Sequence, residues 1–192
     1  MKKIKDTIIY RDDKYYSTFP SVVSRPDGEI LVAFRRAPDR SRFFAPGYTH
    51  ADPNSYLVLV RSRDLGRSWS EPELVHAHPM GGSQDPCMVQ LDDGSLLVAS
   101  YIWMNIPDHA LEHAAKTVRV LDSWHMVPLG GYLVRSCDNG ATWSDPIYPY
   151  RFDDQVAWMP GAEKYALNRG AMTQAADGNL YWLVVHDVKE RL

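Results

Sequence analysis

The sequence has little cysteine, with only Cys87 and Cys137 among 192 residues. Each falls in a different predicted repeat, so reduced thiols are the first interpretation and a disulfide between the two is the alternative. No spacing of cysteines and histidines matches a metal-binding motif. The sequence therefore gives no reason to expect a disulfide framework, a metal or another cofactor.

Long apolar runs and an excess of one charge are also missing. No segment is long enough to span a bilayer, and 1–16 alternates charged and apolar residues without the apolar centre of a signal peptide. A formal net charge of −3 does not suggest a nucleic acid or an anionic membrane as partner. We expect a globular, cytoplasmic protein. An acidic glycan could still bind through a local cluster of arginines.

An eight-residue motif occurs twice, at 62–69 and 136–143, with Ser, Asp, Gly and Trp in the same positions. Ser and Asp side chains accept hydrogen bonds from nearby backbone amides and so close a turn, and Gly supplies a positive φ. The Trp ring can lie back over that turn. Extended segments flank both octets, so each octet is predicted to form the corner of a β-hairpin.

A second repeated element lies upstream of each octet and returns a third time. The segments 19–34, 85–100 and 169–184 align without a gap on an Asp-Gly pair. Asp-Gly between two apolar runs is a strong hairpin signal. Each segment is therefore predicted to be a strand, a tight turn and a second strand.

The two elements together make a four-stranded antiparallel unit that runs twice and begins a third time. Repeated units of this kind are typical of β-propeller blades. We expect an all-β, partial propeller domain over 1–192, with blades at about 17–76 and 84–150 and the start of a third at about 168–192. Two and a half blades cannot close a ring, so the remaining blades are expected from the same longer chain or, alternatively, from another subunit.

Alternating strand direction sorts the connections onto two rims. The Asp-Gly turns and the octets share one, here called the short-turn rim. The opposite, long-loop rim carries the connections 36–54, 76–84, 102–131 and 151–168. Variable long loops on a rigid scaffold are the usual place for binding and catalysis, so the functional site is expected there.

Within the third long connection, 107–121 is rich in Ala, Leu, Glu and Lys and is predicted to contain a short helix. His109 and His113 stand four residues apart on it and could offer two metal ligands. Because no third ligand is identifiable, solvated histidines are the favoured interpretation.

Two further features of the long connections have local interpretations. His76 and His78 should point apart if the chain is extended there. Weak metal binding and hydrogen bonds to sugar hydroxyls are the functional alternatives. Tryptophans without an evident strand partner could stack on sugar rings or fill loop cores; they are Trp103, Trp124 and Trp158.

The octet Ser-x-Asp-x-Gly-x-x-Trp resembles the Asp box of sialidases and related β-propellers. The resemblance implies a six-bladed propeller that acts on a glycan. It also implies three arginines that hold the substrate carboxylate, a Tyr with a supporting Glu as nucleophile, and an Asp as general acid. Arginine suits this task because its planar guanidinium donates two parallel hydrogen bonds to a carboxylate.

The first family arginine comes from a Phe-Arg-Ile-Pro motif, and here the aligned tetrad 17–20 reads Ser-Thr-Phe-Pro. Thr18 therefore stands in the arginine position, a departure that weighs against true sialidase activity. Arg35 and Arg36 follow at the end of the next strand, on the same rim, and could replace the lost cation. Solvated or blade-bridging arginines are the alternative.

By the same resemblance, Asp52 occupies the position of the general acid in the first long loop, with His50 beside it as a candidate for substrate binding. A loop folded over an apolar pocket could give such a carboxyl the proton affinity that an acid needs. The segment Asp-Pro-Asn-Ser is also an ordinary turn sequence, so a purely structural role stays open.

The repeat alignment adds candidates around the central channel. Thr18 and Gln84 share one position at the start of the innermost strands, and Asp85 and Arg169 share the next. We interpret all four as substrate-binding candidates on the long-loop rim. Asp85 and Arg169 could bind a polyol between them or simply pair with each other.

Two functions follow from these patterns. The first is a sialidase-like, exo-acting glycoside hydrolase, as the N-terminal part of a longer chain, with Asp52 as acid and a glycan as substrate. The second is a non-catalytic propeller that binds a carbohydrate or a protein on the same rim. An inward-facing Tyr and Glu and two more arginines in later blades would distinguish them.

Overall fold

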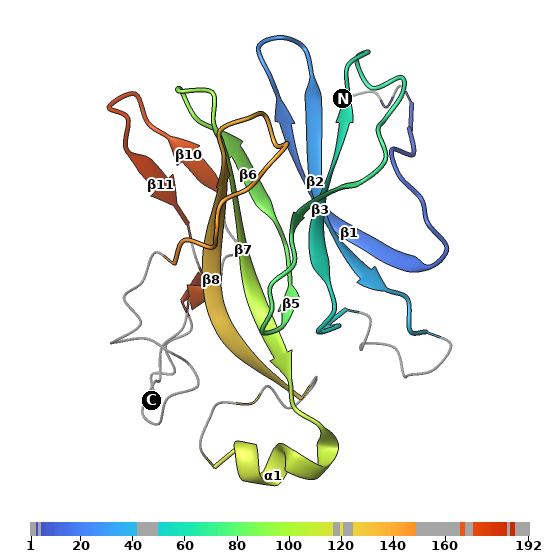
Figure 1. Ribbon diagram of the computed structural model, residues 1–192, viewed down its shortest axis with the longest axis vertical. Helices are drawn as coiled ribbons and strands as arrows, with labels where there is room; N and C mark the ends of the chain where they lie inside the picture. The colour runs from blue at the N-terminus through green and yellow to red at the C-terminus, as the bar shows by residue number, and fades with distance from the viewer. Residues whose placement is uncertain are drawn as a thin grey trace.

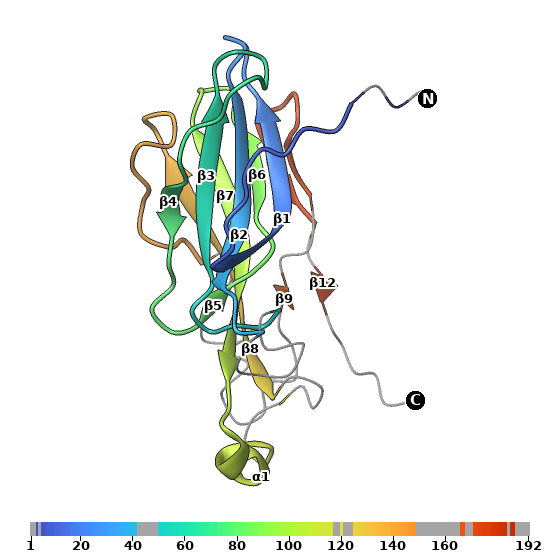
Figure 2. The same ribbon diagram turned by 90° about the vertical axis from the view of Figure 1, so that its right-hand side faces the viewer.

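The computed structural model describes residues 3, 5–41, 50–116, 120, 125–148, 166–167, 171–183 and 185–186. Two four-stranded antiparallel sheets stand next to each other, with short strand pairs beyond the second sheet (Figure 1). The first sheet runs in chain order through β1 (Tyr15–Ser24), β2 (Ile30–Pro38), β3 (Tyr56–Ser62) and β4 (Glu73–His76). Figure 2 shows these four strands side by side.

In the second sheet, one long strand pairs with all of the others. Its strands are β5 (Gly82–Ser83), β6 (Cys87–Gln90), β7 (Leu96–Asn105) and β8 (Met126–Ser136), and β7 pairs with each of the others. Two further pairs are β9 (Ala166–Leu167) with β12 (Val185–His186) and β10 (Met172–Gln174) with β11 (Leu180–Trp182). The first two sheets correspond to two blades, and β10 and β11 form the hairpin of a third.

The three Asp-Gly hairpins have one conformation. In each, the glycine lies in the left-handed region, at φ 88° in Gly28, 82° in Gly94 and 85° in Gly178. The aspartate accepts the amide of the residue two positions later, just before the next strand, as Asp27 does from Glu29 at 3.0 Å. The loop is a turn of three residues closed by a glycine, because only glycine adopts this φ without strain.

The two octets also form the same turn. Ser62 Oγ accepts the Gly66 amide at 2.8 Å, and Ser136 Oγ accepts the Gly140 amide at the same distance. The aspartate at the third position collects the following amides and hydroxyl, as Asp64 does from Ser68. These hydrogen bonds lower the pKa of Asp64 well below its usual range. The octets therefore close hairpin corners as the residue chemistry predicts.

The main core lies between the two sheets. It contains Leu31, Leu57 and Leu59 from the first sheet and Val98 and Tyr132 from the second, all fully buried. These residues alternate along their strands with side chains that face away from the second sheet, such as Val32 and Phe34. Cys87 and Cys137 are free thiols.

The third long connection is shorter than the sequence predicts, because its strands are longer. β7 continues to Asn105 and pairs there with Met126, the first residue of β8. Trp103 is therefore a buried strand residue, 3% exposed and paired with Gly82 and Pro128, and its assignment to a loop is wrong. Trp124 and Trp158 lie outside the described residues.

The predicted helix over 107–121 is also shorter. One 3₁₀ turn, Asp108–Ala110, leads into α1 (Leu111–Ala114), which projects beyond the end of β7 (Figure 1). His109 and His113 are both exposed on it. Neither this helix nor any other among the described residues has the length and apolarity that a membrane span requires.

Candidate functional site

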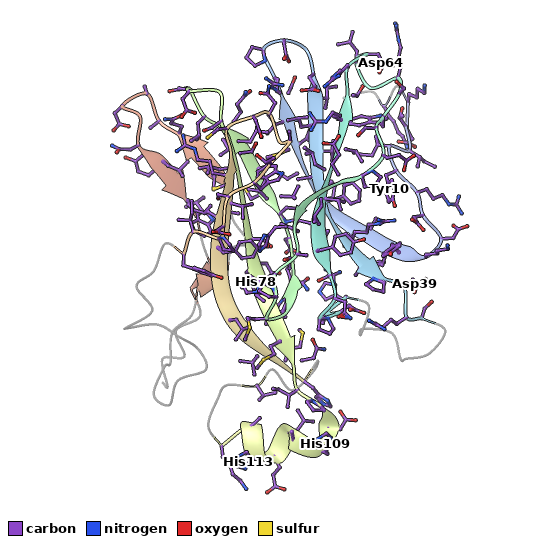
Figure 3. All side chains as sticks on the ribbon, in the orientation of Figure 1. Tyr10, Asp39, Asp64, His78, His109 and His113 are labelled. Carbon is purple, nitrogen blue, oxygen red and sulfur yellow. The ribbon has the colours of Figure 1, made fainter. Side chains whose placement is uncertain are left out.

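The two rims are well separated in the structure. Asp64 marks the short-turn rim, whereas His109 and His113 lie at the far end of the molecule, beyond the long-loop rim (Figure 3). On the long-loop rim, four of the predicted site residues come together at the junction of the two sheets: Arg35, Asp52, Gln84 and Asp85. We call this group, with Arg40, the Arg35 cluster.

Arg35 is the centre of the cluster and is fully buried. It follows Leu31 and Ala33 at the alternating positions of β2, and both of these belong to the core between the sheets. Burial lowers the pKa of Arg35 to about 10, and the nearby carboxylates of Asp52 and Asp85 oppose this shift. Arg35 therefore keeps its charge near neutral pH.

Asp52 is buried as well, under the side chain of Arg40. Its Oδ2 accepts a hydrogen bond from Arg40 Nε, and its Oδ1 accepts the Asn54 amide at 2.8 Å. The side chain of Asp52 is 0% exposed, whereas that of Arg40 is 33% exposed. The cationic face of this pair is thus the part that solvent reaches.

Close backbone packing holds the loop of Asp52 in place. Ser55 Oγ donates to the Ser83 carbonyl at 2.7 Å, and the Ser83 amide donates to the Ser55 carbonyl at 3.0 Å. A Cβ at Gly82 would lie 2.1 Å from the carbonyl oxygen of Asp52. β5 in turn pairs with β7, so the loop is joined to both sheets. The Gly81-Gly82 pair was the sequence signal for this close approach, and sequence reasoning missed it.

Gln84 and Asp85 enter the cluster from the second sheet. Gln84 is 1% exposed, and its amide donates to the Tyr101 carbonyl at 3.0 Å. Within the described part of the chain, its buried Nε2 has no hydrogen-bond partner. Asp85 Oδ2 accepts the Tyr101 hydroxyl at 3.0 Å. Asp85 is thus the second carboxylate that acts on Arg35, and the buried Gln84 joins it through their shared contact with Tyr101.

The structure does not bring Arg36 to this cluster. Neighbouring strand residues face opposite sides of a sheet, so Arg36 points away from Arg35. It forms an ion pair with Asp12 at 2.6 Å and lies over the ring of Tyr15, with 3.7 Å from its Cζ to the ring centroid. Arg36 therefore ties the N-terminal segment to the outer side of the first sheet.

Three predicted site residues remain: Thr18, His50 and Arg169. Thr18 pairs with Arg35 across β1 and β2, just before a bulge. His50 packs edge-on against Phe19, with ring centroids 5.6 Å apart. Arg169 lies outside the described residues, so its expected proximity to Asp85 stays a prediction. Among the described residues, no group of three His, Cys, Asp or Glu side chains could hold a metal ion.

A histidine cluster that the sequence did not reveal lies next to this rim. The rings of His76 and His78 are 5.8 Å apart and both pack on Tyr132, so the expectation that they point apart is wrong. In an extended chain, residues two positions apart lie on the same face, so alternation favours neighbouring rings at 76 and 78 and does not separate them. His78 Nδ1 accepts the Met80 amide at 3.1 Å, which leaves Nε2 to donate to the Tyr148 hydroxyl at 2.8 Å.

Burial, together with the neighbouring His76, lowers the pKa of His78 to about 4 from a usual 6.5. A histidine with a lowered pKa stabilises the fold above pH 6.5, and this contribution is lost as the pH falls toward 4. We expect His78→Gln to reduce the loss of unfolding free energy between pH 6.5 and about 4.5, measured by urea denaturation. His113→Gln, at an exposed helix position, is the control. An unchanged pH dependence in His78→Gln would contradict this assignment.

No protein-family model matches this sequence, and neither does any curated protein. Solved structures do match. A protein of unknown function from Dyadobacter fermentans DSM 18053 is 44% identical with a TM-score of 0.78, over 95% of this chain and 50% of that one. The Hadza microbial sialidase Hz136 is 17% identical with a TM-score of 0.60, over 91% of this chain and 33% of that one. A polysaccharide lyase, the PL25 ulvan lyase, is 14% identical with a TM-score of 0.57, over 92% of this chain and 38% of that one.

These similarities establish the fold. The chain is all-β with the sialidase-like β-propeller architecture, of which about two and a half blades are present, as the repeats predict. It spans half or less of the length of these similar structures.

Proposed function

We propose that this chain forms part of a sialidase-like glycoside hydrolase that acts on a glycan at the long-loop rim. The observation that carries the proposal is the Arg35 cluster, which gathers two carboxylates and two guanidinium groups where the sheets meet. Buried titratable groups of this kind concentrate at functional sites. The named sialidase and polysaccharide lyase share the fold, which supports a glycan as the ligand.

Asp52 takes the role of general acid in this proposal, and Arg40 controls access to it. A general acid must come within hydrogen-bond reach of the leaving oxygen, which a fully covered carboxyl does not. An anionic group on the substrate that binds Arg40 would draw it away and uncover Asp52.

The rest of the site would come from further blades. We propose that this chain is the N-terminal part of a longer protein, with the nucleophile and additional arginines in the later blades. A second subunit that supplies those blades is the alternative. The proposal rests on the matched length, since the 44% identical relative is about twice as long as the matched segment.

A non-catalytic glycan-binding propeller is the second candidate function. It is favoured by the coverage of Asp52, whose carboxylate is 0% exposed and engaged at both oxygens. Thr18, in the position of the first family arginine, favours it too. In that case Arg40 would present a fixed positive charge to a glycan, with Asp52 holding it in position.

The two functions differ in the behaviour of Asp52→Asn. In the hydrolase, we expect the complete protein to cleave aryl sialosides or neutral aryl glycosides, and Asp52→Asn to lower kcat by about 10²-fold to 10⁴-fold. Asp13→Asn, at a side chain that is 90% exposed, is the matched control. Cleavage that Asp52→Asn leaves unchanged would refute the general-acid role. Glycan binding without cleavage would support the non-catalytic function.

A further inference from the structure

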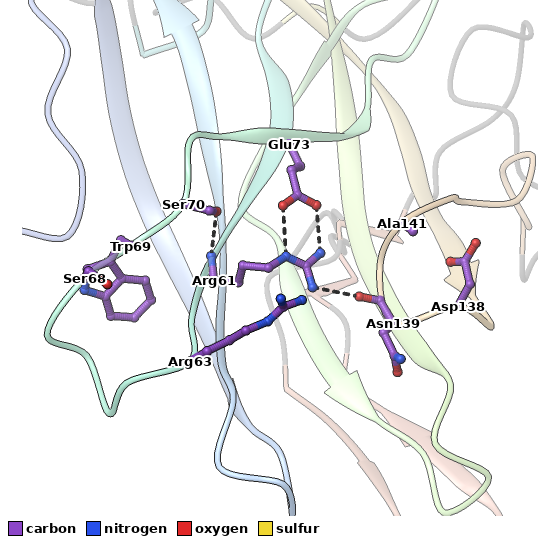
Figure 4. A pocket seen from close by; sticks show the side chains of 9 residues that line it. All are labelled: Arg61, Arg63, Ser68, Trp69, Ser70, Glu73, Asp138, Asn139 and Ala141. Carbon is purple, nitrogen blue, oxygen red and sulfur yellow. Dashed lines mark hydrogen bonds and ion pairs between the residues drawn. The ribbon is translucent and has the colours of Figure 1, made fainter.

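A second concave surface lies on the short-turn rim, away from the Arg35 cluster. It runs between the two octet turns and has a volume of about 690 Å³ (Figure 4). Arg61, Arg63, Trp69 and Glu73 line it from the first sheet, and Asp138 and Asn139 line it from the second. We call it the interblade cleft.

The floor of the cleft is already ordered by paired charges. Arg61 donates to both carboxylate oxygens of Glu73, at 2.9 Å and 2.7 Å, and to the Asn139 carbonyl at 3.2 Å. The side chain of Arg61 is 12% exposed. Because these groups are fixed by one another, a ligand would meet a preorganised polar surface.

Unused hydrogen-bond donors stand above this floor. Arg63 is 78% exposed and donates only through Nε, to Glu29 at 2.9 Å, as far as the described residues show. Its two terminal nitrogens remain available. Asn139 is exposed and accepts from Arg25 through Oδ1 at 2.9 Å, so its side-chain amide nitrogen is a further donor, for which the described residues show no acceptor.

One wall of the cleft is aromatic. Trp69 lines the cleft on the other side of Arg61 from Asp138 and Asn139 (Figure 4), and it is half-buried against the apolar cluster on the face of the first sheet that is turned away from the second. This packing fixes the indole ring, and the octet turn fixes the backbone of Trp69. A fixed aromatic side chain beside polar groups is a common arrangement where proteins hold a partly apolar, partly hydroxylated ligand.

We propose that the interblade cleft binds a neutral carbohydrate segment. Its lining carries two guanidinium groups, of Arg61 and Arg63, and two carboxylates, of Glu73 and Asp138, so the charges balance and neither an anion nor a cation is favoured. Hydrogen bonds from Thr142 and Ser136 lower the pKa of Asp138 to about 2, so it remains ionised. The hydroxyl groups of a sugar both donate and accept hydrogen bonds, which suits a lining that contains both donors and acceptors. A face of the sugar ring can lie against Trp69.

Binding at this cleft requires no catalysis at the other rim, so it stands or fails independently of the hydrolase proposal. The test titrates the protein with cellotriose, xylotriose and mannotriose as neutral probes and with sialyllactose as an anionic one. Saturation-transfer NMR and tryptophan fluorescence report the binding. We expect at least one neutral trisaccharide to bind with a Kd of about 1–10 mM.

Arg63→Ala and Asn139→Asp are the informative variants. The first removes the free donors of an exposed side chain, and the second keeps the oxygen that accepts from Arg25 but removes the amide donor. We expect each to weaken binding by about tenfold, or 1.4 kcal/mol. Arg67→Ala is the matched control, because Arg67 is an exposed arginine in the same turn that does not line the cleft.

Three results would overturn the proposal. One is the absence of binding by all three neutral trisaccharides at about 10 mM. Another is binding that Arg63→Ala and Asn139→Asp leave unchanged, which would place the sugar elsewhere. The third is a preference for sialyllactose that Arg63→Ala removes, which would assign an anionic ligand to the cleft.

Discussion

Gly82→Ala is expected to destabilise the protein by about 3 kcal/mol, the upper part of the usual range for overpacking a tight site. The added Cβ would lie 2.1 Å from the Asp52 carbonyl oxygen and 2.6 Å from Ser55 Oγ. Neither atom can retreat easily, since the Asp52 carbonyl accepts the Ser55 amide and Ser55 is bonded to Ser83. The loop that carries Asp52 would therefore shift away from β5.

Urea denaturation measures this cost, and Gly28→Ala provides the control. Nothing lies within 4 Å of a Cβ at Gly28, but its φ of 88° is strained for alanine. We expect Gly28→Ala to cost about 1 kcal/mol through that strain alone. If Gly82→Ala cost no more than Gly28→Ala, the close approach of β5 to the Asp52 loop would be wrong.

Glu29→Gln is expected to cost about 3 kcal/mol of unfolding free energy, the lower end of the range for breaking a buried ion pair. The side chain of Glu29 is 7% exposed and accepts from Arg25 at 2.6 Å, Arg63 at 2.9 Å and Arg61 at 3.5 Å. Arg25 and Arg61 are themselves largely buried. A neutral glutamine at position 29 would therefore leave their positive charges only partly compensated. Their bonds to Asp27 and Glu73 keep the cost from being larger.

The effect of Glu29→Gln should depend on pH. Burial alone would raise the pKa of Glu29, but hydrogen bonds from Arg63 and Arg25 outweigh it and lower the pKa below 4.5. A carboxylate with a lowered pKa stabilises the fold above about pH 4.5, and this contribution is lost as the pH falls through the folded-state pKa. The difference between Glu29→Gln and the wild type should therefore narrow in acid.

Glu73→Gln is the matched control for Glu29→Gln. Glu73 also pairs with Arg61, but its side chain is 42% exposed. Solvent screens such a pair, so we expect a cost below about 1 kcal/mol. Equal costs for the two variants, or a Glu29→Gln effect that persists undiminished at about pH 3, would show that Glu29 is not the centre of this ion network.

Much of the fold could be predicted from the sequence because its turns are chemically self-sufficient. The octets and the Asp-Gly hairpins are closed by side chains within the same few residues, such as Ser62 with Gly66. Their order along the chain then fixed strand direction and separated the two rims. That separation was enough to locate Arg35, Asp52, Gln84 and Asp85 on one rim.

The partners within that rim followed only from the tertiary structure. Arg40 covers Asp52 across twelve residues of chain, and no local pattern between them indicates the contact. Alternation places Arg35 and Arg36 on opposite faces, but the packing of the second sheet decides which of them is buried with the carboxylates.

The sequence by itself thus determined the propeller-type hairpins, their repeat and the rim that carries the candidate site. Only the tertiary structure decided that Asp52 is covered, that Trp103 is a strand residue, that His76 and His78 meet on Tyr132, and that an interblade cleft joins the octets. The reason is physical. A turn is stabilised by neighbours in sequence, whereas burial and ion pairing depend on which sheets come together, and those contacts link residues far apart in the chain.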